Sequence, residues 1–168
     1  MSAQHIFDHA PLGSLIRYSN KTPKPLARFI NKVRAWEHEN GVGRLIRKEP
    51  AVQRATWASP ACITLPCGNY SSHGTVVLTV RHSHCVTSPL EFSVVGRPAP
   101  GSILVLKHWA GSVELLHVAD DRAAAEFWLK TNHYSDAILE EVLDETPTAA
   151  PEAAREANDE VPGHRSGP

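Results

Sequence analysis

Cysteine is scarce in this sequence, with three residues among 168: Cys62, Cys67 and Cys85. A sparse, odd set is typical of reduced thiols, whereas small secreted proteins stapled by disulfides carry larger, even numbers. Long hydrophobic runs are also lacking, because no run approaches the ~18 residues that a membrane-spanning helix needs. The first 20 residues, which include Asp8 and Pro11, contain neither the basic nor the apolar region of a secretion signal. We therefore expect a cytoplasmic protein without a membrane partner.

The motifs of the common enzyme classes are absent as well. The sequence contains no GxSxG nucleophile elbow, no GxxxxGK(S/T) phosphate loop, no HExxH zinc motif and no GxGxxG dinucleotide motif. The adjacent acids at 120–121 and 140–141 suit helix capping and surface exposure better than an acid/base dyad. We predict a non-enzymatic protein that needs no cofactor.

Cysteine and histidine together leave a small metalloprotein as a less favoured alternative. Cys62, Cys67, His82, His84 and Cys85 are ligand types, and positions 82 and 84 on a strand would share a face. Structural zinc sites usually contain two tight pairs such as CxxC, and the spacing here is wider. We favour small, partly buried cysteines and solvent-facing histidines, and predict no metal site.

A Cys-dependent hydrolase is the other less favoured alternative, because such sites are assembled in space and leave little trace in sequence. Cys85 would be the nucleophile. The candidate bases are His73, His82, His117 and His133.

Composition and periodicity predict one α+β domain over residues 1–143, followed by a disordered acidic tail over 144–168. A helix is predicted over 24–39, with an apolar stripe of Leu26, Phe29, Ile30, Val33 and Trp36 that we expect to pack on a sheet. A second helix is predicted from position 120 or 121 to about 131 because either aspartate can cap it.

Runs of β-branched and alternating apolar residues predict the strands of that sheet. They are expected at 14–18, 43–48, 62–65, 75–80, 92–95, 103–109, 113–118 and 137–143. Residues 110–112 are short enough for a hairpin, so we predict an antiparallel or mixed sheet packed by two main helices. Residues 50–60 are predicted to form an exposed loop that carries Arg54 and Trp57.

Acidic residues are scarce in the first part of the chain, and basic residues are scarce in the last part. Up to Ala110 there are thirteen Lys and Arg against five Asp and Glu, a net charge of +8, and from Gly111 onward the net charge is −9. On the predicted first helix the bases come early and the acids late, an order that the helix dipole disfavours. The stability of the helix therefore does not explain this order of charges, whereas a surface that binds an external anion would explain it.

The predicted binding residues lie between positions 21 and 57, and Trp57 is expected to stack or to fill a pocket. They are Lys21, Lys24, Arg28, Lys32, Arg34, Arg44, Arg47, Lys48, Arg54 and Trp57. The leading hypothesis is an accessory or regulatory protein that binds DNA, RNA or a nucleic-acid-handling protein. The alternative is a protein inhibitor or adaptor that recognises an acidic partner. A solvated face, or one that docks the protein's own acidic tail, also remains open.

Two segments carry a resemblance to a known group of proteins. Residues 6–19 (IFDHAPLGSLIRYS) and 41–50 (GVGRLIRKEP) resemble small accessory proteins of proteobacterial plasmids and integrative conjugative elements. The resemblance implies a bacterial cytoplasm and a role in regulating, maintaining or defending mobile DNA. It assigns no catalytic or binding residue.

Overall fold

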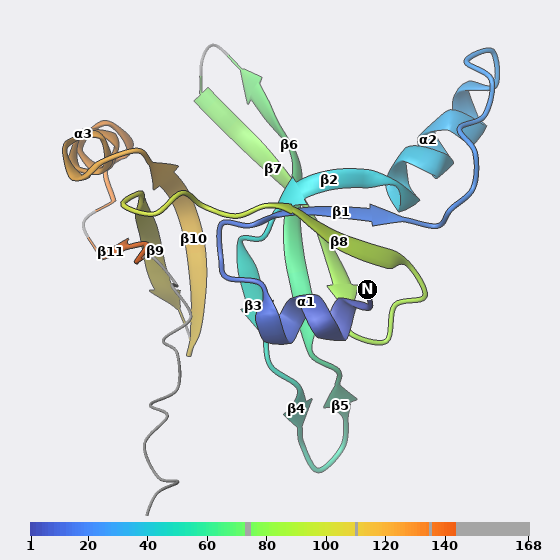
Figure 1. Ribbon diagram of the computed structural model, residues 1–168, viewed down its shortest axis with the longest axis horizontal. Coiled ribbons are helices and arrows are strands. Elements are labelled where there is room, and N and C mark those ends of the chain that lie inside the picture. Colours follow the sequence, from blue (N-terminus) through green and yellow to red (C-terminus); the bar gives the residue numbers. More distant parts are fainter. Residues whose placement is uncertain (73–74, 110, 135, 144–168) are drawn as a thin grey trace, which may run out of the picture.

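The computed structural model describes residues 1–72, 75–109, 111–134 and 136–143. The predicted acidic tail lies outside these residues. The helices are α1 (Ala3–His9), α2 (Ile30–Glu39) and α3 (Arg122–Asn132). The strands are β1 (Leu15–Ser19), β2 (Gly41–Arg44), β3 (Arg47–Glu49), β4 (Val52–Gln53), β5 (Ala58–Ser59), β6 (Cys62–Ser72), β7 (Thr75–Cys85), β8 (Glu91–Gly96), β9 (Ile103–Trp109), β10 (Ser112–Ala119) and β11 (Ala137–Glu141). Figure 1 shows their arrangement. None of the helices within the described part of the chain is long and apolar enough to span a bilayer.

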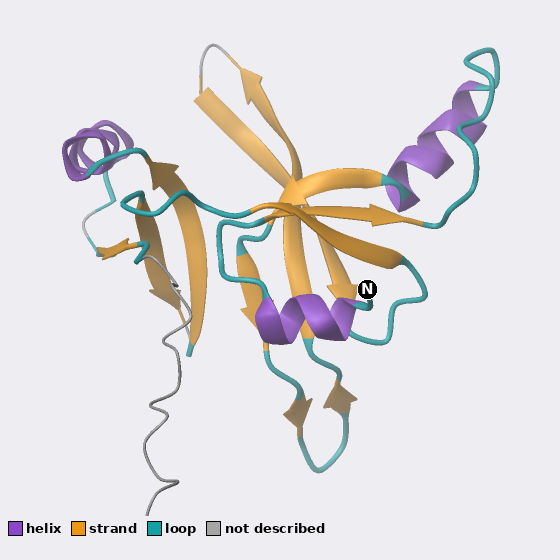
Figure 2. Cartoon of the chain, in the orientation of Figure 1, coloured by secondary structure: helices purple, strands orange, loops and turns teal. Residues whose placement is uncertain are grey.

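The prediction of an α+β domain with two main helices packed on a sheet is wrong, because strands dominate the described residues (Figure 2). They form a three-stranded sheet in the order β2-β1-β8, a six-stranded sheet in the order β11-β9-β10-β3-β6-β7, and the small β4-β5 ladder. Every pairing among them is antiparallel. Of the two predicted helices, α3 packs on the sheet through Ala125, whereas α2 buries none of its residues.

The first hydrophobic core lies where α1, the three-stranded sheet and β6 meet. Its largest members with almost no exposed surface include Ile6, Ile16, Leu45, Ile63 and Phe92. Helix α1 was not predicted, because its seven residues are too few for a periodic pattern to register. It is nevertheless well formed, since the hydroxyl of Ser2 accepts a hydrogen bond from the amide of His5 at 3.3 Å.

Strand β9 is buried on both faces. Ile103 and Val105 face α3, where they form a core with Ala119 and Ala125, whereas Leu104 and Leu106 belong to a separate core with Ile46 and Leu115. This division follows from the two-residue period of a strand, and it accounts for the continuous apolar run of β9.

Several local predictions for the C-terminal part of the fold are confirmed. Helix α3 begins at the expected place, with the Asp121 carboxylate accepting a hydrogen bond from the amide of Ala124 at 2.7 Å. Strands β9 and β10 pair antiparallel up to Trp109 and Ser112, as the short connection predicted. The segment predicted over 137–143 forms the edge strand β11.

The predicted packing of the helix over 24–39 is wrong. Helix α2 begins six residues later, at Ile30, and buries none of its residues. Pro25 disfavours helical geometry at Lys24, and the next residues form a turn in which the Phe29 amide donates to the Leu26 carbonyl at 2.9 Å. In Figure 1, α2 extends away from the sheets at the upper right, so its apolar stripe has no sheet to pack on.

Candidate partner-binding arm

Residues 20–39 form a projecting unit, called here the α2 arm, which is fixed at its base by the buried side chain of Asn40. The Asn40 amide oxygen accepts hydrogen bonds from the hydroxyl of Ser19 at 2.6 Å and from the backbone amide of Asn20 at 3.2 Å. Its amide nitrogen donates to the side-chain oxygen of Asn20 and to the Trp36 carbonyl, each at 2.9 Å. The Asn40 side chain therefore links the end of β1 to the C-terminal turn of α2.

The segment before α2 runs back along the helix and contacts its half-buried tryptophan. The indole nitrogen of Trp36 donates a hydrogen bond to the Thr22 carbonyl at 2.8 Å. Lys24 forms an ion pair with Glu37 at 3.2 Å and lies 5.4 Å from the centroid of the Trp36 ring. An open cleft of about 350 Å³ lies between the segment and the helix, lined in part by Pro25 and Lys32. Trp36, which the sequence placed on the stripe facing a sheet, thus packs within the arm.

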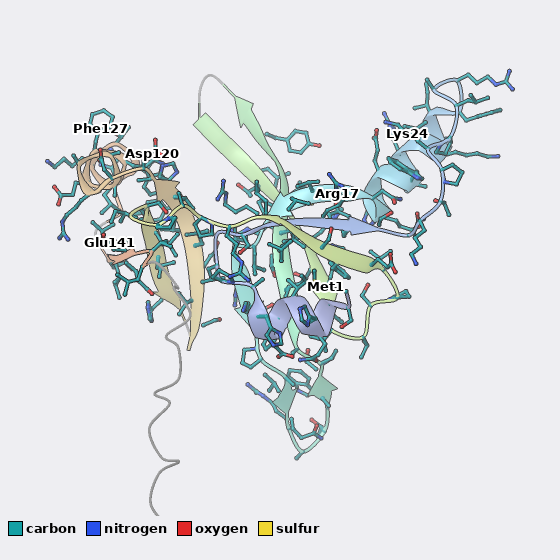
Figure 3. All side chains as sticks on the ribbon, in the orientation of Figure 1. Met1, Arg17, Lys24, Asp120, Phe127 and Glu141 are labelled. Carbon is teal, nitrogen blue, oxygen red and sulfur yellow. The ribbon has the colours of Figure 1, made fainter. Side chains whose placement is uncertain are left out.

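The outer surface of the arm combines apolar and cationic side chains (Figure 3). Leu26 is 63% exposed, Ile30 is 62% exposed and Phe29 is 41% exposed. The Arg28 guanidinium lies 4.8 Å from the centroid of the Phe29 ring, and the Lys32 ammonium lies 5.2 Å from it. Cations and apolar groups that were considered separately in the sequence therefore share one surface.

Five of the predicted binding residues lie on this arm, and they differ in how they are paired. Lys21 forms an ion pair with Glu91 at 2.6 Å, and its hydrogen bond is the main cause of the lowered pKa of that carboxyl. Lys24 is paired with Glu37. Within the described residues, the other three make no ion pair: Arg28, Lys32 and Arg34. These three are the cations available to an external partner.

Three further predicted binding residues are engaged inside the fold. The Arg44 guanidinium donates to the Gly13 carbonyl at 2.8 Å, and the Lys48 ammonium donates to the Phe7 carbonyl at 2.6 Å. Burial lowers the pKa of Lys48, although the nearby carboxylate of Asp8 opposes the shift. Because these cations fix backbone carbonyls, they are poorly placed to serve as an anion-binding surface.

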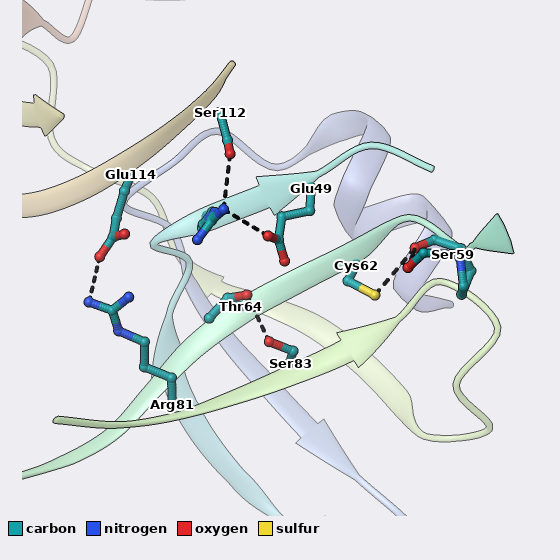
Figure 4. Close-up of polar contacts among 10 residues, drawn as sticks. Glu49, Ser59, Cys62, Thr64, Arg81, Ser83, Ser112 and Glu114 are labelled. Carbon is teal, nitrogen blue, oxygen red and sulfur yellow. Dashed lines mark hydrogen bonds and ion pairs between the residues drawn. The ribbon is translucent and has the colours of Figure 1, made fainter. Parts of the chain in front are cut away.

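Arg47 is the third internal cation, and it joins β3 to its neighbour β10. Its Nη2 atom contacts the Glu49 carboxylate at 2.8 Å and donates to the Ser112 hydroxyl at 3.1 Å (Figure 4). The buried Nε atom of Arg47 has no hydrogen-bond partner within the described residues. Figure 4 also shows the ion pair of Arg81 with Glu114, which joins β7 to β10.

Arg54 and Trp57 lie at the tip of the β4-β5 hairpin, which points to the bottom of Figure 1, whereas α2 extends to the upper right. The Arg54 guanidinium lies 5.5 Å from the centroid of the Trp57 ring, which is 50% exposed. The predicted exposure of residues 50–60 is correct, with a short ladder inside the loop. The ten predicted residues therefore fall into three groups and do not form one continuous surface.

A cluster of histidines at the base of the arm was not foreseen. The ring centroids of His38 on α2 and His82 on β7 lie 4.2 Å apart, and His84 contacts Tyr18 and Phe92 at 4.8 and 5.4 Å. Both β7 histidines are half-buried, in contrast to the predicted solvent-facing positions. Burial lowers their pKa values, and the neighbouring histidines lower them further. Their two-residue spacing placed them on one face, but nothing in the sequence pointed to His38.

The observed positions of the cysteines and histidines can be compared with those that a metal site or a Cys-dependent hydrolase would need. Among residues 1–72, 75–109, 111–134 and 136–143, no group of three or more Cys, His, Asp or Glu is placed to hold a metal ion. The Cys62 thiol donates to the Cys85 sulfur at 3.2 Å. His84, adjacent to Cys85 on β7, points to the opposite face, and the His117 ring stacks on Trp128. Of the other three proposed bases, His82 packs against His38, His133 is the C-cap of α3, and His73 lies outside the described residues.

The chain belongs to the family described as uncharacterised conserved protein UCP036055, whose model matches residues 1–146. Comparison with curated proteins and with solved structures gave no match.

Proposed function

We propose that this family member is a non-enzymatic adaptor whose α2 arm docks into an apolar groove, rimmed by acidic side chains, on a protein partner. The observation that carries the proposal is the apolar surface of an arm whose helix buries none of its residues. It favours the adaptor hypothesis over the nucleic-acid hypothesis that led the sequence interpretation.

The apolar side chains of the arm supply the first part of the argument. A surface helix normally buries its apolar stripe against its own protein, and most of its stability comes from that packing. Leu26 and Ile30 instead expose about two thirds of their surface, and Phe29 lies between them in sequence. Ile30 lies in α2, Phe29 is its N-cap and Leu26 belongs to the segment before it. Exposed apolar residues left without an internal partner at one surface of the arm fit recognition by a partner's groove.

Charge complementarity supplies the second part. Arg28, Lys32 and Arg34 surround this apolar surface without carboxylate partners in the described part of the chain. Acidic side chains at the rim of the groove would pair with them and would accelerate association at low salt. Two copies of the arm are poor partners for each other, because contact between them would bring like charges together.

Nucleic acid is less well matched by the described surface. A groove for a phosphate backbone needs a continuous cationic track, and Arg44, Arg47 and Lys48 are held inside the fold. The aromatic residue expected to stack on bases, Trp57, lies in the β4-β5 hairpin, which extends in a different direction from α2 in Figure 1. The mobile-element context implied by the resemblance stays a prediction.

The adaptor function is tested by capture from the host lysate followed by measurement with the purified captured protein. Ile30→Glu places a charge on the apolar surface of the arm. The matched control is Phe127→Glu, because Phe127 is 72% exposed on another helix, α3, where Figure 3 labels it. A partner must bind the unmodified chain and the Phe127→Glu variant equally, and must lose at least about tenfold in affinity with Ile30→Glu.

Three outcomes would overturn the proposal. One is capture that does not depend on Ile30, and another is a failure to find any protein that distinguishes the two variants. The third is binding of duplex or single-stranded oligonucleotides that weakens with salt and depends on Arg28 and Lys32, since this result would restore the nucleic-acid hypothesis.

A further inference from the structure

Cys62 and Cys85 lie directly opposite each other where β6 begins and β7 ends. Both are free cysteines with partly exposed side chains, and their sulfur atoms are 3.2 Å apart. The pair includes none of the residues that carry the proposed function. We propose that this pair is a redox modification site, at which the two thiols are converted reversibly into a cross-strand disulfide.

The backbone geometry favours such a bond. The amide of Val86 donates to the carbonyl of Ala61 at 2.9 Å, so the hydrogen bonds of the ladder flank the cysteine pair and do not join it. In an antiparallel ladder, pairs of this kind have the closer Cα atoms, about 4.5 Å apart. That separation is within the range that disulfides span, and the sulfur atoms need to approach by only about 1 Å to reach bonding distance.

Cys67 is excluded from the pair by the ladder itself. The register of β6 and β7 shifts between Pro66 and Gly68, which leaves Cys67 as the additional residue of a β-bulge. The hydrogen-bond acceptor of its thiol is the carbonyl of Leu65, at 3.9 Å. Three cysteines therefore resolve into one adjacent pair and one separate thiol, although their odd number in the sequence argued against a disulfide scaffold.

The oxidant that we assign to the step is a low-molecular-weight disulfide. The Cys62 thiol donates its hydrogen bond to the Cys85 sulfur, and burial raises the pKa of Cys62 to about 11, so we assign the first attack to Cys85. The Cys85 thiolate attacks one sulfur of the reagent, forms a mixed disulfide and releases one small thiolate.

The second attack closes the bond. The Cys62 thiolate attacks the Cys85 sulfur of the mixed disulfide and releases the second small thiolate, and its proximity compensates for its low population. Two cysteine thiols lose two electrons and two protons in all, and the reagent gains them to become two thiols. A reducing thiol reverses both steps. The product would link the first residue of β6 to the last residue of β7.

The test uses the full chain and the variant Cys67→Ser, which keeps the pair, with Cys62→Ser as the matched variant that keeps Cys67 and Cys85. Each reduced protein is exposed to oxidised glutathione, its remaining thiols are alkylated, and its tryptic peptides are analysed by mass. Trypsin places Cys62 and Cys67 in the peptide 55–81 and Cys85 in the peptide 82–107, because Arg97 precedes proline. The variants are therefore needed to assign the bond.

We expect Cys67→Ser to lose both thiols and to yield the linked peptides 55–81 and 82–107, with recovery of both thiols after reduction. Linkage should form at least about tenfold faster than in Cys62→Ser, which should instead accumulate the glutathione adduct. Retention of both thiols by Cys67→Ser, a stable adduct at Cys85 in that variant, linkage between two chains, or equally fast linkage in Cys62→Ser would each overturn the proposal.

Discussion

The ammonium group of Lys48 donates a hydrogen bond to the carbonyl oxygen of Phe7 at 2.6 Å and lies 5.8 Å from the centroid of the Phe7 ring. Phe7 is in the last turn of α1, where carbonyl groups have no partner within the helix. Lys48 therefore caps the C-terminus of α1 with a positive charge, which the helix dipole favours.

Lys48→Met should lower the free energy of unfolding by about 1–2 kcal/mol, because a charge-assisted hydrogen bond and a favourable dipole interaction are lost. Denaturant titration measures the change. The control is Lys32→Met on the α2 arm, which should change stability by less than about 0.5 kcal/mol and should weaken partner binding instead. Equal stability of the two variants would contradict the capping role of Lys48.

The histidine cluster predicts that stability falls as the pH is lowered. Burial lowers the pKa values of His82 and His84 below the ordinary value of 6.5, so the unfolded chain binds more protons than the folded chain in that range. Stability is therefore fully present above pH 6.5 and is lost as the pH falls below it. The groups that face the two rings are His38 from α2, Tyr18 from β1 and Phe92 from β8.

Thermal unfolding between about pH 8 and about pH 5 measures this dependence. His82→Gln should flatten the curve, because one titrating group is removed and His84 loses a like-charged neighbour. His108→Gln is the matched control, since His108 is exposed on β9. A curve for His82→Gln that is as steep as that of the unmodified protein would count against the cluster as its cause.

Gly41→Ala should destabilise the protein through a steric conflict with a core residue. A Cβ atom at position 41 would lie 2.7 Å from the hydroxyl oxygen of Tyr18, whose side chain is buried in the first core. Overpacking of this kind costs about 1–3 kcal/mol. Gly68→Ala is the control, because a Cβ atom there meets nothing within 4 Å. Denaturant midpoints should separate the two variants, and a similar midpoint for both would refute the conflict.

The elements that the sequence predicted well are those whose signals are local. Asp121 caps α3 through its own side chain, and the apolar run of β9 follows from burial on both faces. The predicted strand over 43–48 is divided in the structure into β2 and β3, and of the two residues between them Leu45 belongs to the first core and Ile46 to the second. A local pattern identifies both residues as buried but carries no information on which core each one joins.

The candidate site shows the same limit of local patterns. Spacing grouped Lys48 with Arg28 because both are cations on a basic stretch of chain, yet Lys48 contacts a backbone carbonyl and Arg28 is exposed. Every residue has a carbonyl group, so no sequence pattern marks the one that a cation binds. The exposure of Leu26 was equally hidden, since an apolar stripe has the same spacing whether it faces a core or a partner.

The six-stranded sheet is continuous only through the three residues of β3, whose register with β10 consists of the single pair Arg47 and Glu114. Two backbone hydrogen bonds of Ile46 complete this connection, because its amide donates to the Thr64 carbonyl and its carbonyl accepts from the Leu115 amide. Native-state hydrogen exchange should therefore show amides of β9, β10 and α3 opening as a cooperative group separate from those of β1 and β6. Exchange of all these amides at one common free energy would argue otherwise.

The short connection through β3 affects how the two parts of the molecule respond to amino-acid substitutions. Strain introduced around α3 reaches the half that carries the arm through β3 and through two side-chain contacts, Arg47 with Ser112 and Arg81 with Glu114. We therefore expect a destabilising substitution in the core around α3 to loosen β9 and β10 more than β1 and β6.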